Sequence, residues 1–501
     1  MQQGSVWLTT AERPRHPPLT ADLEVDVAVV GAGLVGLTTA LFAARDGARV
    51  AVLEAARIGA GTSGRTTGKV TSQHGLIYAD LAERHGEDVA RGYADANQAG
   101  LAKLAELAEE FPVDCEPVRL PAFAYAVRPE GRDRIAAEVR AAQRAGLPAT
   151  ATTDLPLPFP VQAAVRFDDQ LLVHPGRYLA GLAGAVVAAG GMIFEGTRIG
   201  EVDESRDGTV RLTAVNGVRV RAGRAVLATL LPPGVIGGYF ARTRPTRSYG
   251  LAVTLRAPAP EAMTISVDGP TRSLRPWRSD GLIVVGNDHE PGSEPDTEAG
   301  YRDLADWARS TFAVASVDHR WAAQDYRTPD RLPYVGRTPF SSRILTATGF
   351  AKWGLSAGTA AALLLADLIS DRPGHPWQSI FDATRIGDAA TVGRLIKDNL
   401  SVGTEFVGGR FGEAGEADDL APGRGGLILL DGRRLGGYRD ADGTLHAVTP
   451  TCTHLGCPLH WNRADISWDC RCHGSRFDID GAVLDGPAVE PLARHEPADR
   501  S

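Results

Sequence analysis

VDVAVVGAGLVGLTTALFAARDGARVAVLE, from Val25 to Glu54, is a strand–turn–helix–strand pattern near the start of the chain. Its first six residues, VDVAVV, are apolar except for Asp26, as is typical of a buried parallel strand. The glycine motif GAGLVG follows directly, a helical pattern comes next, and a second apolar strand ends in the acid Glu54. Elements in this order predict a Rossmann-like domain that binds a dinucleotide.

The glycines and the acid have separate tasks in such a site. Glycine permits a tight turn and lets a pyrophosphate approach the N-terminus of the following helix. Glu54 is placed to accept hydrogen bonds from the adenosine ribose. The alternative to dinucleotide binding is a glycine-rich turn in an ordinary α/β domain. It would mean that strand, glycines, helix, strand and acid occur in this order by chance.

A second glycine- and threonine-rich loop, GAGTSGRTTGK at residues 59–69, follows the dinucleotide motif. It resembles the corresponding loop of the glycine oxidase, sarcosine oxidase and D-amino-acid oxidase superfamily, and this resemblance implies FAD rather than NAD. The glycerol-3-phosphate dehydrogenase branch has a similar loop followed by His-Gly, as in Gln73-His74-Gly75. His74 is therefore either a site of covalent flavin attachment or a polar loop histidine, and non-covalent FAD is our working assumption.

The resemblance extends over residues 24–385 and ends with the segment TGFAKWGL, residues 348–355, which opens a helix over Ser356–Ile369. In the superfamily this helix N-terminus points at the electron-rich edge of the flavin, where its positive dipole stabilises the reduced form. The residues that the resemblance assigns to FAD binding are Gly31, Ala32, Gly33, Gly36, Glu54, Thr62, Arg65, Thr66, Thr67, Val202, Gly349, Lys352, Trp353 and Gly354.

The domain boundaries follow from these motifs and from shifts in periodicity. We expect a leader at 1–23, a linker at 386–409 and a separate C-terminal domain at 410–501. The linker includes a short helical pattern at Thr391–Leu400. Within 24–385, the dinucleotide part covers about 24–115, 165–235 and 325–385. A mixed-sheet substrate cap covers about 116–164 and 236–324. The chain carries no substrate signature, and Arg247, Tyr249 and Lys352 are catalytic candidates by location only.

The C-terminal stretch TCTHLGCPLHWNRADISWDCRCHGSRFD, Thr451–Asp478, contains two paired metal-ligand motifs. Cys452 and His454 form a C-x-H pair, and Cys470 and His473 form a C-x-x-H pair. Two thiolates and two imidazoles suit a 2Fe–2S cluster with mixed ligation. Such a set also suits zinc, but zinc does not explain the two further cysteines of the stretch.

CTHLGC followed by C-x-C-H-G-S resembles the Rieske proteins that contain a disulfide. The resemblance implies that Cys452, His454, Cys470 and His473 hold the cluster and that Cys457 and Cys472 form the bridge between its two loops. It also implies that Ser475 donates a hydrogen bond to a cluster sulfur. Phe477 stands where high-potential members often have tyrosine, so we expect a lower potential than theirs.

Composition sets the wider limits. The chain has 501 residues, 43% of them hydrophobic, and a net charge of −8. These values predict two or three globular domains and give no electrostatic case for nucleic-acid binding. The longest apolar run, Ala357–Ile369, is too short to span a bilayer, no signal peptide is visible, and we expect a cytoplasmic protein. Of the five cysteines, only Cys115 lies outside the cluster stretch.

The combined resemblance is to an amino-acid-oxidase-type FAD enzyme fused to a Rieske domain. It implies a dehydrogenase that oxidises a small amine, amino acid or hydroxy acid and passes electrons through the cluster to an external protein or quinone. Two alternatives stay open: a reductase or monooxygenase component with reversed electron flow, and a redox sensor or electron-transfer protein.

Overall fold

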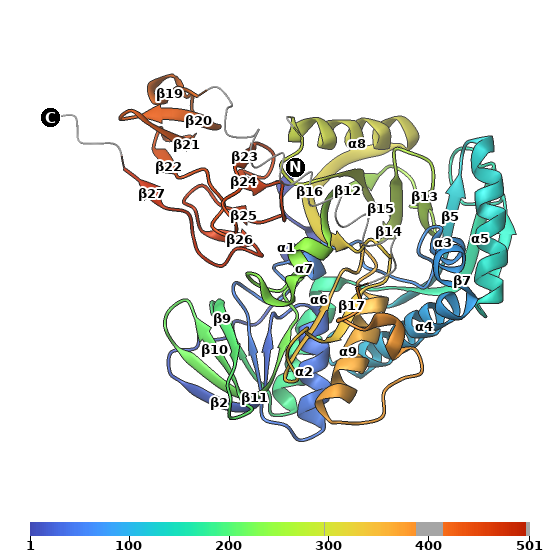
Figure 1. Cartoon of the computed structure of the whole chain (residues 1–501). Helices are drawn as coiled ribbons and strands as arrows, with labels where there is room; N and C mark the ends of the chain where they lie inside the picture. Colours follow the sequence, from blue (N-terminus) through green and yellow to red (C-terminus); the bar gives the residue numbers. More distant parts are fainter. Residues whose placement is uncertain (295, 387–413, 497–501) are drawn as a thin grey trace.

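The apolar run at the start of the dinucleotide motif forms β2 (Leu23–Val30), an inner strand of a mostly parallel eight-stranded sheet. Val27 and Val29 pack against helices on one face, and Ala28 and Val30 belong to a second cluster on the other face. Burial on both faces explains why the strand is continuously apolar from Val27 to Val30, whereas Glu24 and Asp26 at its start are exposed. The structure is a computed structural model that describes residues 1–294, 296–386 and 414–496 (Figure 1).

This first sheet has the order β17–β18–β11–β2–β3–β8, and β10 pairs with both β11 and β9. Strands β18, β11, β2, β3 and β8 are parallel, and β17 is antiparallel to β18. Besides β2, its strands are β3 (Val50–Leu53), β8 (Met192–Phe194), β9 (Ile199–Glu204), β10 (Val210–Ala214), β11 (Arg219–Leu227), β17 (Tyr334–Arg337) and β18 (Ile344–Thr348).

Helices cover one face of this sheet. Helix α2 begins within the glycine motif, at Leu34, and packs against both α6 and α9, and α4 in turn packs against α9 (Figure 1). The helices are α1 (Val6–Thr10), α2 (Leu34–Arg45), α3 (Ile77–His85), α4 (Glu87–Glu110), α5 (Arg132–Arg144), α6 (Pro175–Ala188), α7 (Tyr239–Arg242), α8 (Thr297–Thr311) and α9 (Ser356–Ile369). Within the described part of the chain, none combines the length and apolar character needed to cross a bilayer.

A second, ten-stranded mixed sheet stands beside the first, with the order β1–β16–β12–β15–β14–β13–β5–β7–β4 and β6 paired to β7. Helix α8 covers one of its faces (Figure 1). Its strands are β1 (Gln2–Gln3), β4 (Lys69–Val70), β5 (Val118–Ala126), β6 (Ala149–Thr152), β7 (Ala163–Leu172), β12 (Arg244–Leu255), β13 (Met263–Ser266), β14 (Arg272–Trp277), β15 (Gly281–His289) and β16 (Val314–Arg327).

The C-terminal region consists of two small antiparallel-rich sheets, drawn in orange and red in Figure 1. One sheet contains β19 (Gly415–Glu416), β20 (Arg424–Leu430), β21 (Arg433–Arg439), β22 (Leu445–Val448) and β27 (Arg494–His495). The other contains β23 (Leu459–Asn462), β24 (Ser467–Cys470), β25 (Arg476–Phe477) and β26 (Val483–Asp485). The expected fold class, a Rossmann-like region with a mixed-sheet subdomain followed by an all-β region, is confirmed.

Two expected boundaries need correction. The leader at 1–23 is an integral part of the fold: Trp7 is fully buried in one cluster with Trp277 and Trp321, and its indole donates to the Thr66 carbonyl at 2.6 Å. Strand β7 pairs with β5, so the mixed sheet continues to Leu172. The first residues are mostly polar and rich in proline, and this composition does not reveal that Val6 and Trp7 are buried. The helical pattern at Thr391–Leu400 lies outside the described residues.

Candidate functional site

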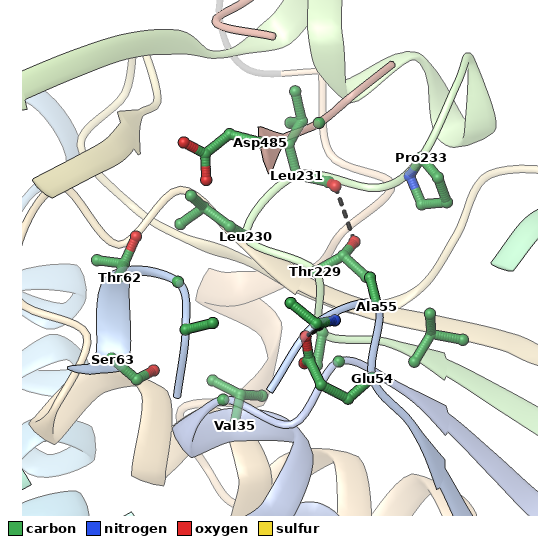
Figure 2. Close-up of a pocket in the computed structure, with 18 of the residues that line it drawn as sticks. Val35, Glu54, Ala55, Thr62, Ser63, Thr229, Leu230, Leu231, Pro233 and Asp485 are labelled. Carbon is green, nitrogen blue, oxygen red and sulfur yellow. Dashed lines mark hydrogen bonds between the residues drawn. The ribbon is translucent and has the colours of Figure 1, made fainter. Parts of the chain in front are cut away.

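A cavity of about 360 Å³ lies at the carboxyl end of β2, where the glycine motif begins. Its walls come from segments that are distant in sequence, and Figure 2 shows Val35 and Glu54 on one side with Asp485 on the other. The residues that line it include Gly31, Gly33, Leu34, Val35, Glu54, Thr62, Ser63, Arg65, Thr66, Thr197, Arg198, Ile199, Thr229, Leu231, Pro233, Asp325, Tyr326, Lys352, Gly354 and Asp485.

The glycines of this cavity are required by close backbone approaches. Gly31 has a φ of +103°, and a Cβ atom there would lie 2.5 Å from the carbonyl oxygen of Ala228. A Cβ atom on Gly36 would lie 1.9 Å from the carbonyl oxygen of Gly31. The turn therefore brings bare backbone to the start of α2, as a pyrophosphate site demands.

Glu54 completes the nucleotide site. Its carboxylate accepts the backbone N–H groups of Ala32 and Ala56, each at 2.8 Å. Burial raises the pKa of Glu54 above its ordinary value, although these two donors oppose the shift. The cradle, the cavity and the acid together fit the nucleotide part of FAD.

Most positions assigned to FAD by resemblance lie at this site. Gly31, Gly33, Glu54, Thr62, Arg65, Thr66, Lys352 and Gly354 line the cavity. Ala32, Gly36 and Gly349 belong to the surrounding backbone. Val202 is a correction: its side chain lies in the apolar cluster of β9 and β10, and Thr197, Arg198 and Ile199 line the cavity instead. Strand β9 begins at Ile199, so only its first residue reaches the cavity.

A second, smaller cavity of about 100 Å³ lies between the glycine–threonine loop and the mixed sheet. It shares Thr62, Arg65, Thr66, Asp325 and Lys352 with the first cavity. Further lining residues are Thr67, Lys69, Thr246, Ser248, Gly250, Ile265, Thr271, Ser273, Val285, Asp288, Trp321, Gln324 and Trp353. The two spaces meet at these flavin-motif residues, so the smaller cavity adjoins the nucleotide site.

Lys69 brings a positive charge into this second cavity. Its ammonium group donates to the Thr264 carbonyl at 2.8 Å and to the Ser273 hydroxyl at 2.6 Å. Desolvation of the ammonium group, together with the like charge of Arg275, lowers the pKa of Lys69 to about 7. Among the described residues, no carboxylate forms an ion pair with it. A ligand that carries an anionic group would supply the missing partner.

Lys352, the candidate from the returning flavin motif, faces both cavities. Its ammonium group pairs with Asp288, whose other oxygen accepts the Ser248 hydroxyl at 2.7 Å. The backbone N–H of Lys352 donates to Asp325 at 2.6 Å. Burial raises the pKa of Asp325 to about 6 despite this donor and the N–H of Tyr326. The junction of the two cavities thus holds two acids and a cation close to one another.

The other two catalytic candidates are corrected by the structure. Thr246, Ser248 and Gly250 of β12 line the second cavity, so Arg247 and Tyr249 lie on the opposite face of the strand. Tyr249 packs against Tyr301 of α8, and Arg247 pairs with Asp465 of the C-terminal region. Tyr249 thus packs within the mixed-sheet region, Arg247 joins that region to the C-terminal one, and neither residue lines the cavity.

His74 lies outside the lining of both cavities. Its Nδ1 interacts with the Tyr93 hydroxyl at 2.8 Å, and its Nε2 lies 2.7 Å from the Thr71 carbonyl. The ring stacks on Trp353 with centroids 4.4 Å apart, and burial lowers its pKa to about 3. These contacts make His74 a structural support behind the flavin motif and favour non-covalent FAD.

The four expected cluster ligands lie in two loops of the C-terminal region. Cys452 and Cys470 are buried free thiols, and a hydrogen bond between them lowers the pKa of Cys452. The Nδ1 atoms of His454 and His473 are buried and have no hydrogen-bond partner in the described residues. Two thiols and two orphaned ring nitrogens fit a 2Fe–2S cluster with mixed ligation.

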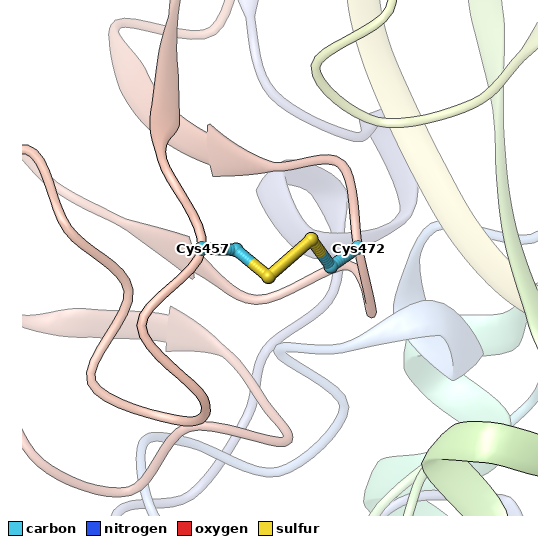
Figure 3. Close-up of a disulfide and its surroundings, with 2 residues drawn as sticks. All are labelled: Cys457 and Cys472. Carbon is cyan, nitrogen blue, oxygen red and sulfur yellow. A yellow bond between two sulfur atoms is a disulfide. The ribbon is translucent and has the colours of Figure 1, made fainter. Parts of the chain in front are cut away.

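The remaining two cysteines form the expected bridge. Cys457 and Cys472 are joined by a disulfide that links the two loops (Figure 3). The Cys470 sulfur lies within 4.8 Å of both bridged sulfurs. The disulfide uses these two sulfurs, which leaves Cys452 and Cys470 as the free thiols of the stretch that could bind a cluster. Ser475 is fully buried, and its hydroxyl accepts the N–H of Ala488 at 3.0 Å.

The cluster loops dock directly on the wall of the nucleotide cavity. Tyr326, which lines that cavity, donates its hydroxyl to the His473 carbonyl at 2.9 Å. The neighbouring Gln324 donates to the Gly474 carbonyl at 2.8 Å. His454 Nε2 lies 3.1 Å from the Gly234 carbonyl, and Phe240 packs edge-on against the rings of both ligand histidines.

A buried ionic network reinforces this docking. Asp465 is shared between Arg247 of the mixed sheet and Arg476 of the C-terminal region, the latter at 3.2 Å. Arg476 also pairs with Asp469 and Asp485, each at 2.9 Å. Burial opposes ionisation of Asp465, but the two guanidinium groups outweigh it and lower its pKa.

Comparison with known families matches this architecture. The model of the family "FAD dependent oxidoreductase" matches residues 26–368. The chain belongs to this FAD-dependent oxidoreductase family. A second model, "Rieske [2Fe-2S] domain", matches residues 411–496 of the oxidoreductase. Its cofactors are therefore FAD and a Rieske-type 2Fe–2S cluster.

Relatives share one or both parts of the oxidoreductase. It is 34% identical over 495 residues to the "Putative Rieske 2Fe-2S iron-sulfur protein YhfW" of Bacillus subtilis strain 168, covering 97% of this chain and 96% of that protein. Glycine oxidase from Geobacillus kaustophilus superposes with a TM-score of 0.61 at 19% identity, over 72% of this chain and 99% of that one. L-proline dehydrogenase from P. horikoshii superposes with a TM-score of 0.61 at 17% identity, over 73% of this chain and 98% of that one. These two structures show the shared fold.

Sequence reasoning missed several lining residues. Lys69 ends the quoted glycine–threonine loop, but nothing local distinguishes it from a surface lysine. Asp325 and Tyr326 precede a recognised turn, where an acid and an aromatic residue in a strand carry no signal of their own. The C-terminal residues in the nucleotide cavity, among them Asp485, lie beyond the quoted Rieske stretch and carry no motif that points to a nucleotide.

Proposed function

We propose that this oxidoreductase is a dehydrogenase that oxidises a small amine, amino acid or hydroxy acid and passes the electrons through its Rieske cluster to an external protein or quinone. When bound, FAD supplies two-electron oxidation and the cluster supplies one-electron transfer. The observation that carries the proposal is the shared wall: Tyr326 lines the nucleotide cavity and donates to the carbonyl of the cluster ligand His473.

The second cavity supports an acid as the substrate. Lys69 presents a buried cation with no carboxylate partner among the described residues, so a substrate carboxylate would complete the pair. Hydroxyl groups of Ser248, Thr271 and Ser273 offer further hydrogen bonds, and the volume of about 100 Å³ restricts the substrate to a small molecule. An amino acid or hydroxy acid satisfies these features better than an uncharged amine.

The contacts of the chain give each region a defined task. Lys69 holds the anionic group, while Trp321 and Trp353 limit the space and exclude water. The Asp288–Lys352 pair and Asp325 lie at the junction of the two cavities, where a proton released by the substrate would be accepted. Asp325, whose pKa is raised to about 6, is ionised at neutral pH and is the candidate acceptor.

An anaerobic screen of small amines, amino acids and hydroxy acids, followed by bleaching of flavin absorbance, tests the proposal. We expect bleaching with one acid class and, in its presence, reduction of an artificial one-electron acceptor. Assayed with FAD in excess, His473→Ala should retain bleaching and lose acceptor reduction. The control His446→Ala, at a β22 histidine that pairs with Asp440 and Asp480, should retain both. Wild-type acceptor turnover by His473→Ala would remove the cluster from the path and favour a sensor.

A further inference from the structure

The segment Val483–Val489 of the C-terminal region forms part of the wall of the nucleotide cavity. All seven of its residues line the space, together with Arg476. Figure 2 shows Asp485 across the cavity from Glu54 and Val35, which belong to the dinucleotide region. A nucleotide bound in this cavity would therefore contact both regions of the chain.

Hydrogen bonds to three backbone carbonyls of this segment attach it to the N-terminal part of the chain. Arg198 donates to the Val483 carbonyl at 2.8 Å, and the N–H of Gly234 donates to the Pro487 carbonyl at 2.9 Å. The Tyr326 hydroxyl lies 3.4 Å from the Gly486 carbonyl. The donors Arg198 and Tyr326 are themselves lining residues, so the segment is fixed at the edge of the cavity.

The same segment is attached to the cluster loop from the other side. The N–H of Ala488 donates to Ser475 Oγ at 3.0 Å, two residues after the ligand His473. Arg476 pairs with Asp485 at 2.9 Å and is buried. An ordered cluster loop thus holds the segment in the position at which it closes the cavity.

We propose that the Rieske domain is a structural part of the FAD-binding site, through Val483–Val489, and that FAD binding and cluster assembly stabilise each other. The cluster orders the loop that carries Ser475, and Ser475 holds Ala488. FAD fills the space against which the segment packs. Coupling between two binding sites is reciprocal, so each ligand must raise the affinity for the other by the same factor.

The first test measures the dissociation constant of FAD by fluorescence quenching in the full chain. The double variant Leu484→Ala, Val489→Ala shortens two lining side chains, and we expect FAD to bind about tenfold more weakly because apolar contact with the nucleotide is lost. Its visible circular dichroism should still report an intact cluster. Leu429→Ala, on the exposed side of β20 in the same domain, is the matched control and should bind FAD like the wild type.

The second test uses wild-type protein and needs no variant to fold. FAD is removed from the cluster-loaded chain, and cluster loss to an iron chelator is followed by circular dichroism with and without added FAD. We expect saturating FAD to slow the loss several-fold. Equal rates, or equal FAD affinity of the double variant and the control, would overturn the proposal. Neither measurement depends on a substrate, so the result is independent of the proposed dehydrogenase activity.

Discussion

Replacing Asp465 by asparagine should weaken the docking of the two regions more than replacing Arg247, although each change breaks the same ion pair. Arg247 is 1% exposed, and its only ion-pair partner among the described residues is Asp465. Its Nε and Nη1 atoms have no hydrogen-bond partner there either. Asp465→Asn therefore leaves a buried guanidinium without a counter-charge, which costs about 3–5 kcal/mol.

Arg247→Met should cost less stability than Asp465→Asn, because the buried charge that remains keeps a partner. Asp465 keeps Arg476 at 3.2 Å, a contact with a gross attraction of about 5 kcal/mol at an effective dielectric constant of about 20. The methionine also removes two unpaired buried donors. We expect a loss of about 1–2 kcal/mol. The double variant should cost about the same, because Arg476 retains Asp469 and Asp485. Arg247→Met should thus partly rescue Asp465→Asn.

Urea unfolding of the full, cofactor-loaded chain, followed by the visible circular dichroism of the cluster, measures these free energies. Arg494→Met is the control, because its ion pair with Asp480 is exposed and should change stability by less than about 0.5 kcal/mol. If Arg247→Met destabilises as much as Asp465→Asn, or if the two losses add in the double variant, the network does not work as described.

Further outcomes are expected from changes elsewhere in the chain. Cys457→Ser should make the cluster more labile to chelators and leave the flavin spectrum unchanged, because it frees the two cluster loops from each other; an equally stable cluster would argue against that role. Lys69→Met should weaken binding of a carboxylate inhibitor, measured by flavin difference spectra, by about tenfold or more. In the wild type this affinity should fall above pH 7, as the ammonium group loses its proton, and in the variant it should not depend on that titration; Lys103→Met, at an exposed pair, is the control. Tyr326→Phe should slow cluster reduction by substrate while flavin bleaching keeps its rate, because the contact with the His473 carbonyl is lost; unchanged stopped-flow traces would exclude this contact from the path. Asp465 has a folded pKa below its unfolded value of about 3.9, so its stabilising effect is complete above that pH and is lost as pH falls further; Arg247→Met should shift acid unfolding to higher pH.

Several features of this oxidoreductase follow from its sequence because they depend on short-range patterns. In the GAGLVG turn after β2, Gly31 is required by its positive φ angle and by its close approach to the backbone of Ala228. The φ constraint acts within a few residues and is therefore visible in the sequence. Ligand identity and spacing likewise set the pairs Cys452–His454 and Cys470–His473. The bridge Cys457–Cys472 was implied by resemblance and is present.

The tertiary structure alone decided which side chains face the cavities. Side chains of a strand alternate, so the one-residue difference between Ser248 and Tyr249 separates the substrate space from the interior beneath α8. The sequence of β12 separates an apolar face with Tyr249 and Leu251 from a more polar face with Ser248 and Thr254, but it does not show which face meets a cavity. The sequence likewise gives no sign of the hydrogen bond from Arg198 to the Val483 carbonyl, because these residues are 285 positions apart. Only the docking of the two regions, stabilised by buried charges and by main-chain hydrogen bonds, brings the cluster loops to the wall of the flavin site.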